Sequence, residues 1–185
     1  MPMNSVRFQR PNPIALLRLF CFPYAGGRLA YETGIDRFPP EVRRNVGLYS
    51  IHPHGRASNH GDPLFYELPP LLVTLERMIV PYHDLPYAFF GRSLGPLLGF
   101  ELARELRRRE LPGPVHLTAS GHRAPQRFDP NDAIHNMPDR EFRAKLRELG
   151  GTSEEVLQNA ELIELLTPIL HADERRCFDQ PLSHL

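Results

Sequence analysis

The sequence predicts an α/β domain in which helices are layered on a largely parallel β-sheet. Three observations support this class. The chain has 185 residues and 41% apolar content, which is enough for one globular domain with its own core. Its apolar runs and helical periodicities follow in the order strand, loop, strand, helix, strand, helix, strand. A helical segment without strands comes next, and strands that alternate with helices favour parallel pairing.

Composition and charge argue against several other classes of protein. The formal net charge is zero, so nothing in the charge balance indicates nucleic acid or an anionic membrane as a partner. Arg18 interrupts the apolar stretch at 14–22, which therefore fits neither a signal-peptide core nor a membrane span. We expect a cytoplasmic protein. Cys21, in a predicted buried strand, and Cys177, near the end of the sequence, are expected to be free thiols, and the chain has no C-x-x-C pair.

The first predicted strand, at 16–22, leads into residues 23–27, which read PYAGG. Adjacent Gly26 and Gly27 allow the backbone to approach a ligand, and N–H groups exposed there could hold an oxyanion. An ordinary turn accounts for the same residues, and on this evidence alone it is the simpler interpretation.

A second strand is predicted at Val46–Ile51, and the loop after it contains three histidines. His52, His54 and His60 suggest a zinc site. The loop has no cysteine or glutamate ligand set to accompany them, so we favour ordinary loop histidines and expect no bound metal.

The segment after Asp62-Pro63 has the spacing of an amphipathic helix. Pro69 and Pro70 fit its first turn, where a missing N–H is tolerated. The apolar residues that recur at helical spacing are Leu68, Leu71, Leu72, Leu75, Met78 and Ile79.

The most informative stretch is a predicted strand at 87–90 followed by GRSLG at 91–95, a G-x-S-x-G motif. In a nucleophile elbow, a strand turns sharply into a helix and the strained serine at the turn, here Ser93, projects its hydroxyl into a site. Gly91 and Gly95 would let the strand and the helix pass closely. The alternative is an ordinary glycine-rich connection with an unreactive serine.

A helix is predicted directly after Ser93, because apolar residues recur every four positions at Leu94, Leu98, Leu102 and Leu106. Pro96 fits its first turn, and the arginines at 107–109 suit the carboxyl end of the helix dipole. The sequence LPGP at 111–114 ends the helix, and a further strand is predicted at 115–120.

The pattern at 131–170 is helical. One helix, Asp139–Leu149, has an apolar face and ends at Gly150-Gly151. A capping box at 152–155 begins a second one. These helices are expected either to cover the active edge of the sheet as a lid or to pack on the sheet as a terminal pair. The apolar residues expected to face inward are Phe142, Leu146, Leu149, Leu162, Ile163, Leu165, Leu166 and Ile169.

Five motifs occur in order along residues 17–176: FCFPYAGG at 20–27, FFGRSLG at 89–95, FELAR at 100–104, SGHRAP at 120–125, and LGGT at 149–152 followed by EVL at 155–157. Together they resemble type II thioesterases, the stand-alone α/β-hydrolase enzymes associated with nonribosomal peptide and polyketide synthases. The resemblance implies an α/β-hydrolase-like core at about 14–125, a helical lid at about 131–170 and a divergent tail at 171–185.

The activity implied by this resemblance is hydrolysis of acyl or aminoacyl groups from the phosphopantetheine thiol of acyl or peptidyl carrier proteins, with no metal or organic cofactor. Ser93 matches the nucleophile, and the backbone N–H groups of Ala25 and Leu94 match the oxyanion hole. Gly91 and Gly95 match the glycines of the elbow.

The chain also departs from the pattern of the family it resembles. Arg92 replaces the usual histidine, and the expected Asp and His of the triad would lie well beyond the lid. Asp179 and His184 fall in the right order but too close to the lid to match those positions. Two expectations stay open: a thioesterase whose missing C-terminal portion is supplied elsewhere, or a catalytically impaired remnant that binds carrier proteins or has no function.

Overall fold

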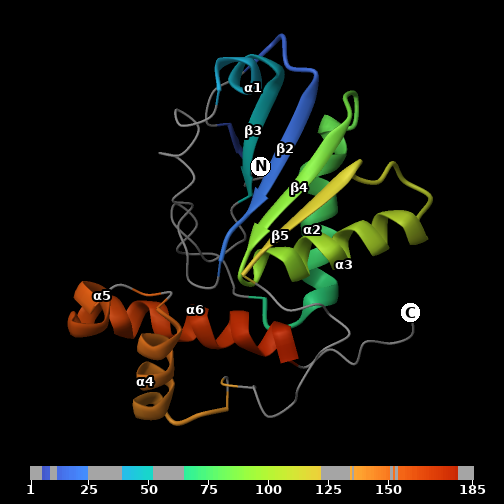
Figure 1. The fold of residues 1–185 in the computed structure, drawn as a ribbon. Coiled ribbons are helices and arrows are strands. Elements are labelled where there is room, and N and C mark those ends of the chain that lie inside the picture. The colour runs from blue at the N-terminus through green and yellow to red at the C-terminus, as the bar shows by residue number, and fades with distance from the viewer. Residues whose placement is uncertain are drawn as a thin grey trace.

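The computed structural model describes residues 6–8, 12–24, 39–51, 65–121, 134, 136–150, 152 and 154–178. The described strands form one sheet in the order β1-β3-β2-β4-β5 (Figure 1). Their bounds are Val6–Phe8, Leu17–Phe22, Val46–Ile51, Tyr87–Arg92 and His116–Ser120 for β1 to β5. Only β1 pairs in the antiparallel direction, so the predicted, largely parallel sheet is confirmed.

Two amphipathic helices cover one face of this sheet, α2 (Leu68–Ile79) and α3 (Gly95–Arg108). Both begin with proline in the first turn, as predicted. A short helix, α1 (Pro40–Asn45), precedes β3, and a 3-10 turn, η4 (Val80–Tyr82), follows α2. The sequence did not predict α1, η4 or β1, because none of them is long enough to show a periodic pattern.

An aromatic row on the helix-covered face holds the sheet and the helices together. Phe20 lies beside Tyr49 on β3 and beside Phe89 on β4. The Phe22 and Phe89 rings meet edge to face at a centroid distance of 5.0 Å, and both side chains are fully buried. Burying such large rings supplies much of the apolar free energy of a small domain. The α3 residues that pack here are Leu94, Leu98, Leu102 and Leu106, as their spacing predicted.

The positive charge of Arg18 within β2 is accommodated by three polar partners. Its guanidinium forms a bidentate ion pair with Asp84, and its Nε donates to the Tyr49 hydroxyl at 3.0 Å. Another nitrogen donates to the Tyr82 carbonyl at 2.6 Å. The charge is therefore satisfied at the amino end of β2, where it joins the sheet to the segment after α2.

Cys21 is a free, buried thiol, as expected. It lies on the opposite face of the sheet from the aromatic row, beside Leu48. Burial raises the pKa of the Cys21 thiol to about 12, so this cysteine is an unreactive core residue at neutral pH. The side chain of Cys177 lies outside the described part of the chain.

The turn from β4 to α3 depends on two glycines at points of backbone contact. A Cβ atom on Gly91 would lie 2.2 Å from the Gly95 carbonyl carbon and from the Pro96 nitrogen. A Cβ atom on Gly95 would lie 2.6 Å from the Phe22 carbonyl oxygen at the end of β2. Only glycine fits either position without moving backbone atoms.

The helices of the C-terminal segment form their own apolar cluster beyond the carboxyl ends of the strands (Figure 1). They are α4 (Asp139–Leu149), α5 (Glu154–Gln158) and α6 (Ala160–Phe178). The bounds of α4 are those predicted, and Gly150 ends it with a left-handed φ of 65°. The buried members of the cluster are Ile134, Phe142, Leu146, Leu157, Ile163 and Leu170.

Two expectations for this segment are corrected. Leu149 and Leu162 are exposed rather than inward-facing, because each lies near a helix end where the other helices do not cover it. The last helix extends to Phe178, beyond the helical pattern at 131–170, and Pro168 lies within it. No helix in the described ranges is long and apolar enough to cross a membrane.

β5 forms one edge of the described sheet. The edge strand is largely exposed, but its exposed side chains are His116, Thr118 and Ala119, and Leu117 is partly buried against α3. The edge is therefore open but mostly polar, because its main apolar side chain turns toward the core.

Gly95→Ala should destabilise the fold, because the added methyl group would collide with the Phe22 carbonyl. Overpacking of this kind costs about 1–3 kcal/mol, and urea denaturation measures the change in the free energy of unfolding. Gly113→Ala is the matched control, since a Cβ atom there meets nothing within 4 Å. Equal stability of the two variants would contradict the close contact.

Asp84→Asn should reduce stability more at neutral pH than at acid pH. Hydrogen bonding from Arg18 lowers the pKa of Asp84 below its ordinary value. A carboxylate with a depressed pKa adds stability above its unfolded pKa of about 3.9 and loses it as the pH falls through the folded pKa. Urea unfolding of both proteins at about pH 7 and about pH 3 tests this. A deficit that grew on acidification would argue against the ion pair.

Candidate active site

Ser93 lies at the sharp turn between β4 and α3, where the sequence placed it. Its φ is 55°, in the left-handed region that a residue with a side chain rarely adopts. The Ser93 N–H donates to the Ser120 carbonyl at 2.9 Å, which ties the turn to the end of β5. The side chain is half-buried. A strained serine at this kind of turn is the geometry that exposes a hydroxyl for nucleophilic attack.

The amino end of α3 supplies backbone donors next to this serine. Leu94 is the N-cap residue, and its carbonyl accepts hydrogen bonds from Leu97 and Leu98 at 3.1 and 3.3 Å. The first N–H groups of a helix have no intrahelical acceptor and lie at the positive end of the helix dipole. Such donors suit a negatively charged oxygen that forms beside Ser93.

Ala25, the second predicted oxyanion donor, lies outside the described residues, as do Gly26 and Gly27. The strand that leads to it is described. Phe22 ends β2 opposite Gly91, and its carbonyl touches the start of α3. The 23–27 segment therefore begins at the carboxyl ends of the strands, where Ser93 also lies, because β2 and β4 run in parallel.

Two described histidines lie at the far end of the strands from Ser93. His83 stacks on Tyr87, the first residue of β4, with ring centroids 4.9 Å apart, and burial lowers its pKa. His116 pairs with Ala88, five residues before the serine. Five strand residues span about 16 Å, so neither imidazole is placed to take the Ser93 proton.

His171 belongs to the helical segment. Its ring stacks on Phe142 at a centroid distance of 4.0 Å, and its Nε2 lies 3.8 Å from the Asp139 carboxylate. Asp173, two residues further along α6, is fully buried. Other side chains that are able to serve in acid–base chemistry or metal binding lie outside the described residues: His52, His54, His60, His122, Asp179 and His184.

Within the described ranges, no group of three His, Cys, Asp or Glu side chains could hold a metal ion. Arg92, which replaces a histidine in the motif, is exposed at the last position of β4, opposite Ser120. It places a positive charge directly before the serine.

A cavity that apolar periodicity does not predict lies on α4. Arg140, Arg143 and Arg147 line it, together with three other residues. Their spacing of three and four residues puts them on one face of the helix, which is a signal that the sequence contains.

Known thioesterases are similar to this chain in sequence and in fold. It is 40% identical over 167 residues to the gramicidin S biosynthesis protein GrsT of Aneurinibacillus migulanus, covering 90% of this chain and 64% of that one. The solved thioesterase RedJ, from the prodiginine pathway of Streptomyces coelicolor, matches with a TM-score of 0.83 and 33% identity, over 95% of this chain and 68% of RedJ. The type II thioesterase BorB of the borrelidin cluster matches with a TM-score of 0.79 and 26% identity, over 97% and 71%.

The predicted α/β-hydrolase-like fold is thereby confirmed. The chain spans slightly less than two thirds of the length of GrsT. The thioesterase domain matches residues 17–180, which include β2 to β5 and all the described helices after them. This chain belongs to the thioesterase-domain family.

Proposed function

We propose that this chain acts on acyl or aminoacyl thioesters of carrier-protein phosphopantetheine in nonribosomal peptide or polyketide biosynthesis, with Ser93 as the nucleophile. The observation that carries this proposal is the strained Ser93 between β4 and α3 in a chain of the thioesterase family. The similarity to GrsT and RedJ supports the biosynthetic setting.

The proposed reaction has two steps. The Ser93 oxygen bonds to the thioester carbonyl carbon while its proton passes to a general base, and the C–S bond then breaks to release the thiol. Water next attacks the acyl-serine ester, which frees the acid and restores the serine. Serine chemistry of this kind needs neither a metal nor an organic cofactor.

The oxyanion formed in each step needs hydrogen-bond donors. We assign this role to the backbone N–H groups of Leu94 and Ala25. Leu94 is supported by its place at the amino end of α3, and Ala25 by the position of the strand that leads to it. Each donor of this type lowers the barrier by about 3 kcal/mol.

The rate of the proposed reaction depends on a general base. Among the described histidines, His83 and His116 lie at the far end of the strands from Ser93, and His171 stacks on Phe142 in the helical segment. We propose weak hydrolysis by this chain taken by itself, because a serine without its base loses several orders of magnitude in rate. The same observation favours a second candidate function, in which the chain binds carrier proteins but releases little product.

The proposed partner is an acyl or peptidyl carrier protein in the cytoplasm. The formal net charge of zero gives no support for nucleic acid as a further partner.

The purified chain should release thiol from an acyl-pantetheine thioester orders of magnitude more slowly than a typical enzyme, for which kcat is about 10 per second. The residual release should fall further in Ser93→Ala, because the oxyanion donors alone give only weak catalysis. Thiol release followed with a chromogenic reagent measures both rates.

Two results would overturn parts of this account. Equal release by the wild type and Ser93→Ala would remove Ser93 as the nucleophile. Turnover of about one per second that is abolished in both Ser93→Ala and His184→Ala would show that the C-terminal residues do supply a base.

A further inference from the structure

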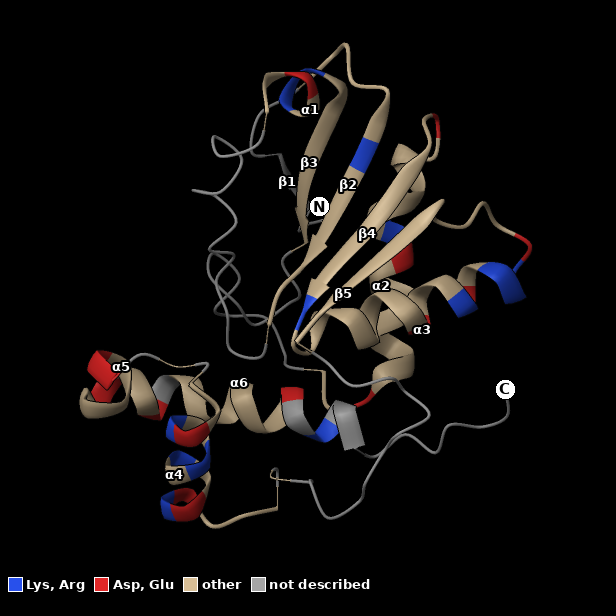
Figure 2. Ribbon diagram, in the orientation of Figure 1, with Lys and Arg blue, Asp and Glu red and all other residues tan. Residues whose placement is uncertain are grey.

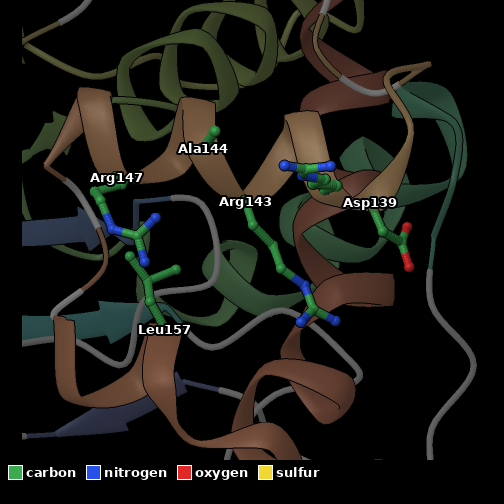
Figure 3. Close-up of a pocket in the computed structure, with 6 residues that line it drawn as sticks. Asp139, Arg143, Ala144, Arg147 and Leu157 are labelled. Carbon is green, nitrogen blue, oxygen red and sulfur yellow. The ribbon is translucent and has the colours of Figure 1, made fainter.

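The helical segment carries a cavity of about 540 Å³, and none of the residues assigned to the chemical steps at Ser93 lines it (Figure 3). Its lining comes from α4 and α5 and consists of Asp139, Arg140, Arg143, Ala144, Arg147 and Leu157. A cavity of this size holds a small organic molecule rather than a bare ion. Leu157 is buried and gives it an apolar wall.

The face of α4 that lines the cavity is basic. Figure 2 shows that charged residues gather on α4, whereas most of the sheet is uncharged. The apolar residues Phe142 and Leu146 point into the helical cluster, so the arginines occupy a separate face. Figure 3 shows Arg143 and Arg147 extending from the same side of α4.

The three arginines differ in their partners. Arg147 forms two hydrogen bonds of 2.9 and 3.0 Å with Glu154, which fixes α4 against α5. The Nε of Arg143 is buried and has no hydrogen-bond partner among the described residues. An unpaired buried donor destabilises the folded state, and Arg143 is one of the residues that line the cavity. An acceptor that enters the cavity therefore meets a guanidinium group whose hydrogen bonds are not all made.

The charge balance indicates the sign of that acceptor. Glu154 neutralises Arg147, and Asp139 can offset only one of the remaining two arginines. One positive charge is left over. The planar guanidinium group binds phosphate with two parallel hydrogen bonds, which a lysine cannot do.

We infer that the α4 cavity binds the phosphate end of a phosphopantetheine group, with Arg143 as its main donor and Arg140 beside it. This inference rests on the proposed function, in which the pantetheine phosphate is the anion that every carrier-bound substrate shares. A small ligand is favoured over the carboxylates of a flat protein surface, because Arg143, whose Nε has no hydrogen-bond partner in the described part of the chain, lines a cavity.

Binding of 4′-phosphopantetheine and of pantetheine to Ser93→Ala protein, measured by isothermal titration calorimetry, tests the inference without hydrolysis. We expect at least tenfold tighter binding of the phosphorylated compound. Arg143→Gln should remove this preference, and Arg140→Gln should weaken it. Raising the salt concentration should reduce it, because the interaction is between charges.

Lys145→Gln is the matched control. Lys145 lies on the same helix, does not line the cavity and pairs with Glu148 at 2.9 Å. Its loss should leave the preference for phosphate unchanged. Circular dichroism and urea unfolding establish that each variant is folded, and exposed Arg140 provides a second variant if Arg143→Gln is unstable.

Coenzyme A and a holo carrier protein present this phosphate chemistry from two sources. The holo carrier protein bears the phosphopantetheine group and its apo form does not. Tighter binding of the holo form, lost in Arg143→Gln, would support the carrier protein as the source of the phosphate. A preference confined to free coenzyme A, with the same Arg143 dependence, would support the phosphate site with the free cofactor as the source.

Equal affinity for phosphopantetheine and pantetheine, or a preference that survives Arg143→Gln in folded protein, would overturn the inference. Neither result would bear on Ser93, since binding is measured in its absence. Conversely, a wild-type chain that hydrolyses nothing would leave the phosphate preference measurable.

Discussion

Backbone contact among β2, β4 and α3 is the constraint on which the rest of the site depends. Gly91 packs against the first turn of α3, and Gly95 packs against the Phe22 carbonyl. The chain must reverse direction between these two contacts, and this forces Ser93 to a φ of 55°. The strain is supported by the buried leucine face of α3, which holds the helix start in place.

The parallel sheet places this contact at the candidate active site. Parallel strands have their carboxyl ends on the same side of the sheet, so the ends of β2, β4 and β5 meet around Ser93. The Ser120 carbonyl holds the serine N–H there, while the helices α4 to α6 lie beyond the same edge (Figure 1). The lid role of these helices stays a prediction. Their arginine-lined cavity is the place where we propose that the phosphate binds.

Periodicity in the sequence was enough to predict β3, α2, α4 and the strand–turn–helix around Ser93, because each has a long apolar pattern with clear turn residues at its ends. It could not predict β1 or α1, which are too short, nor the Arg18–Asp84 pair, which joins residues 66 positions apart. It also misjudged Leu149, because exposure at a helix end depends on what packs beside it. The roles of Ser93, Leu94 and Ala25 are still predictions.

Mass spectrometry of the chain after long incubation with an acyl-pantetheine thioester tests the central claim most directly. The strained turn should make Ser93 the residue that receives the acyl group, and without an efficient base the acyl-serine should persist. We expect one acyl adduct, on the peptide that contains Ser93, and none in Ser93→Ala. Adducts on other residues, or an adduct that persists in Ser93→Ala, would contradict the account.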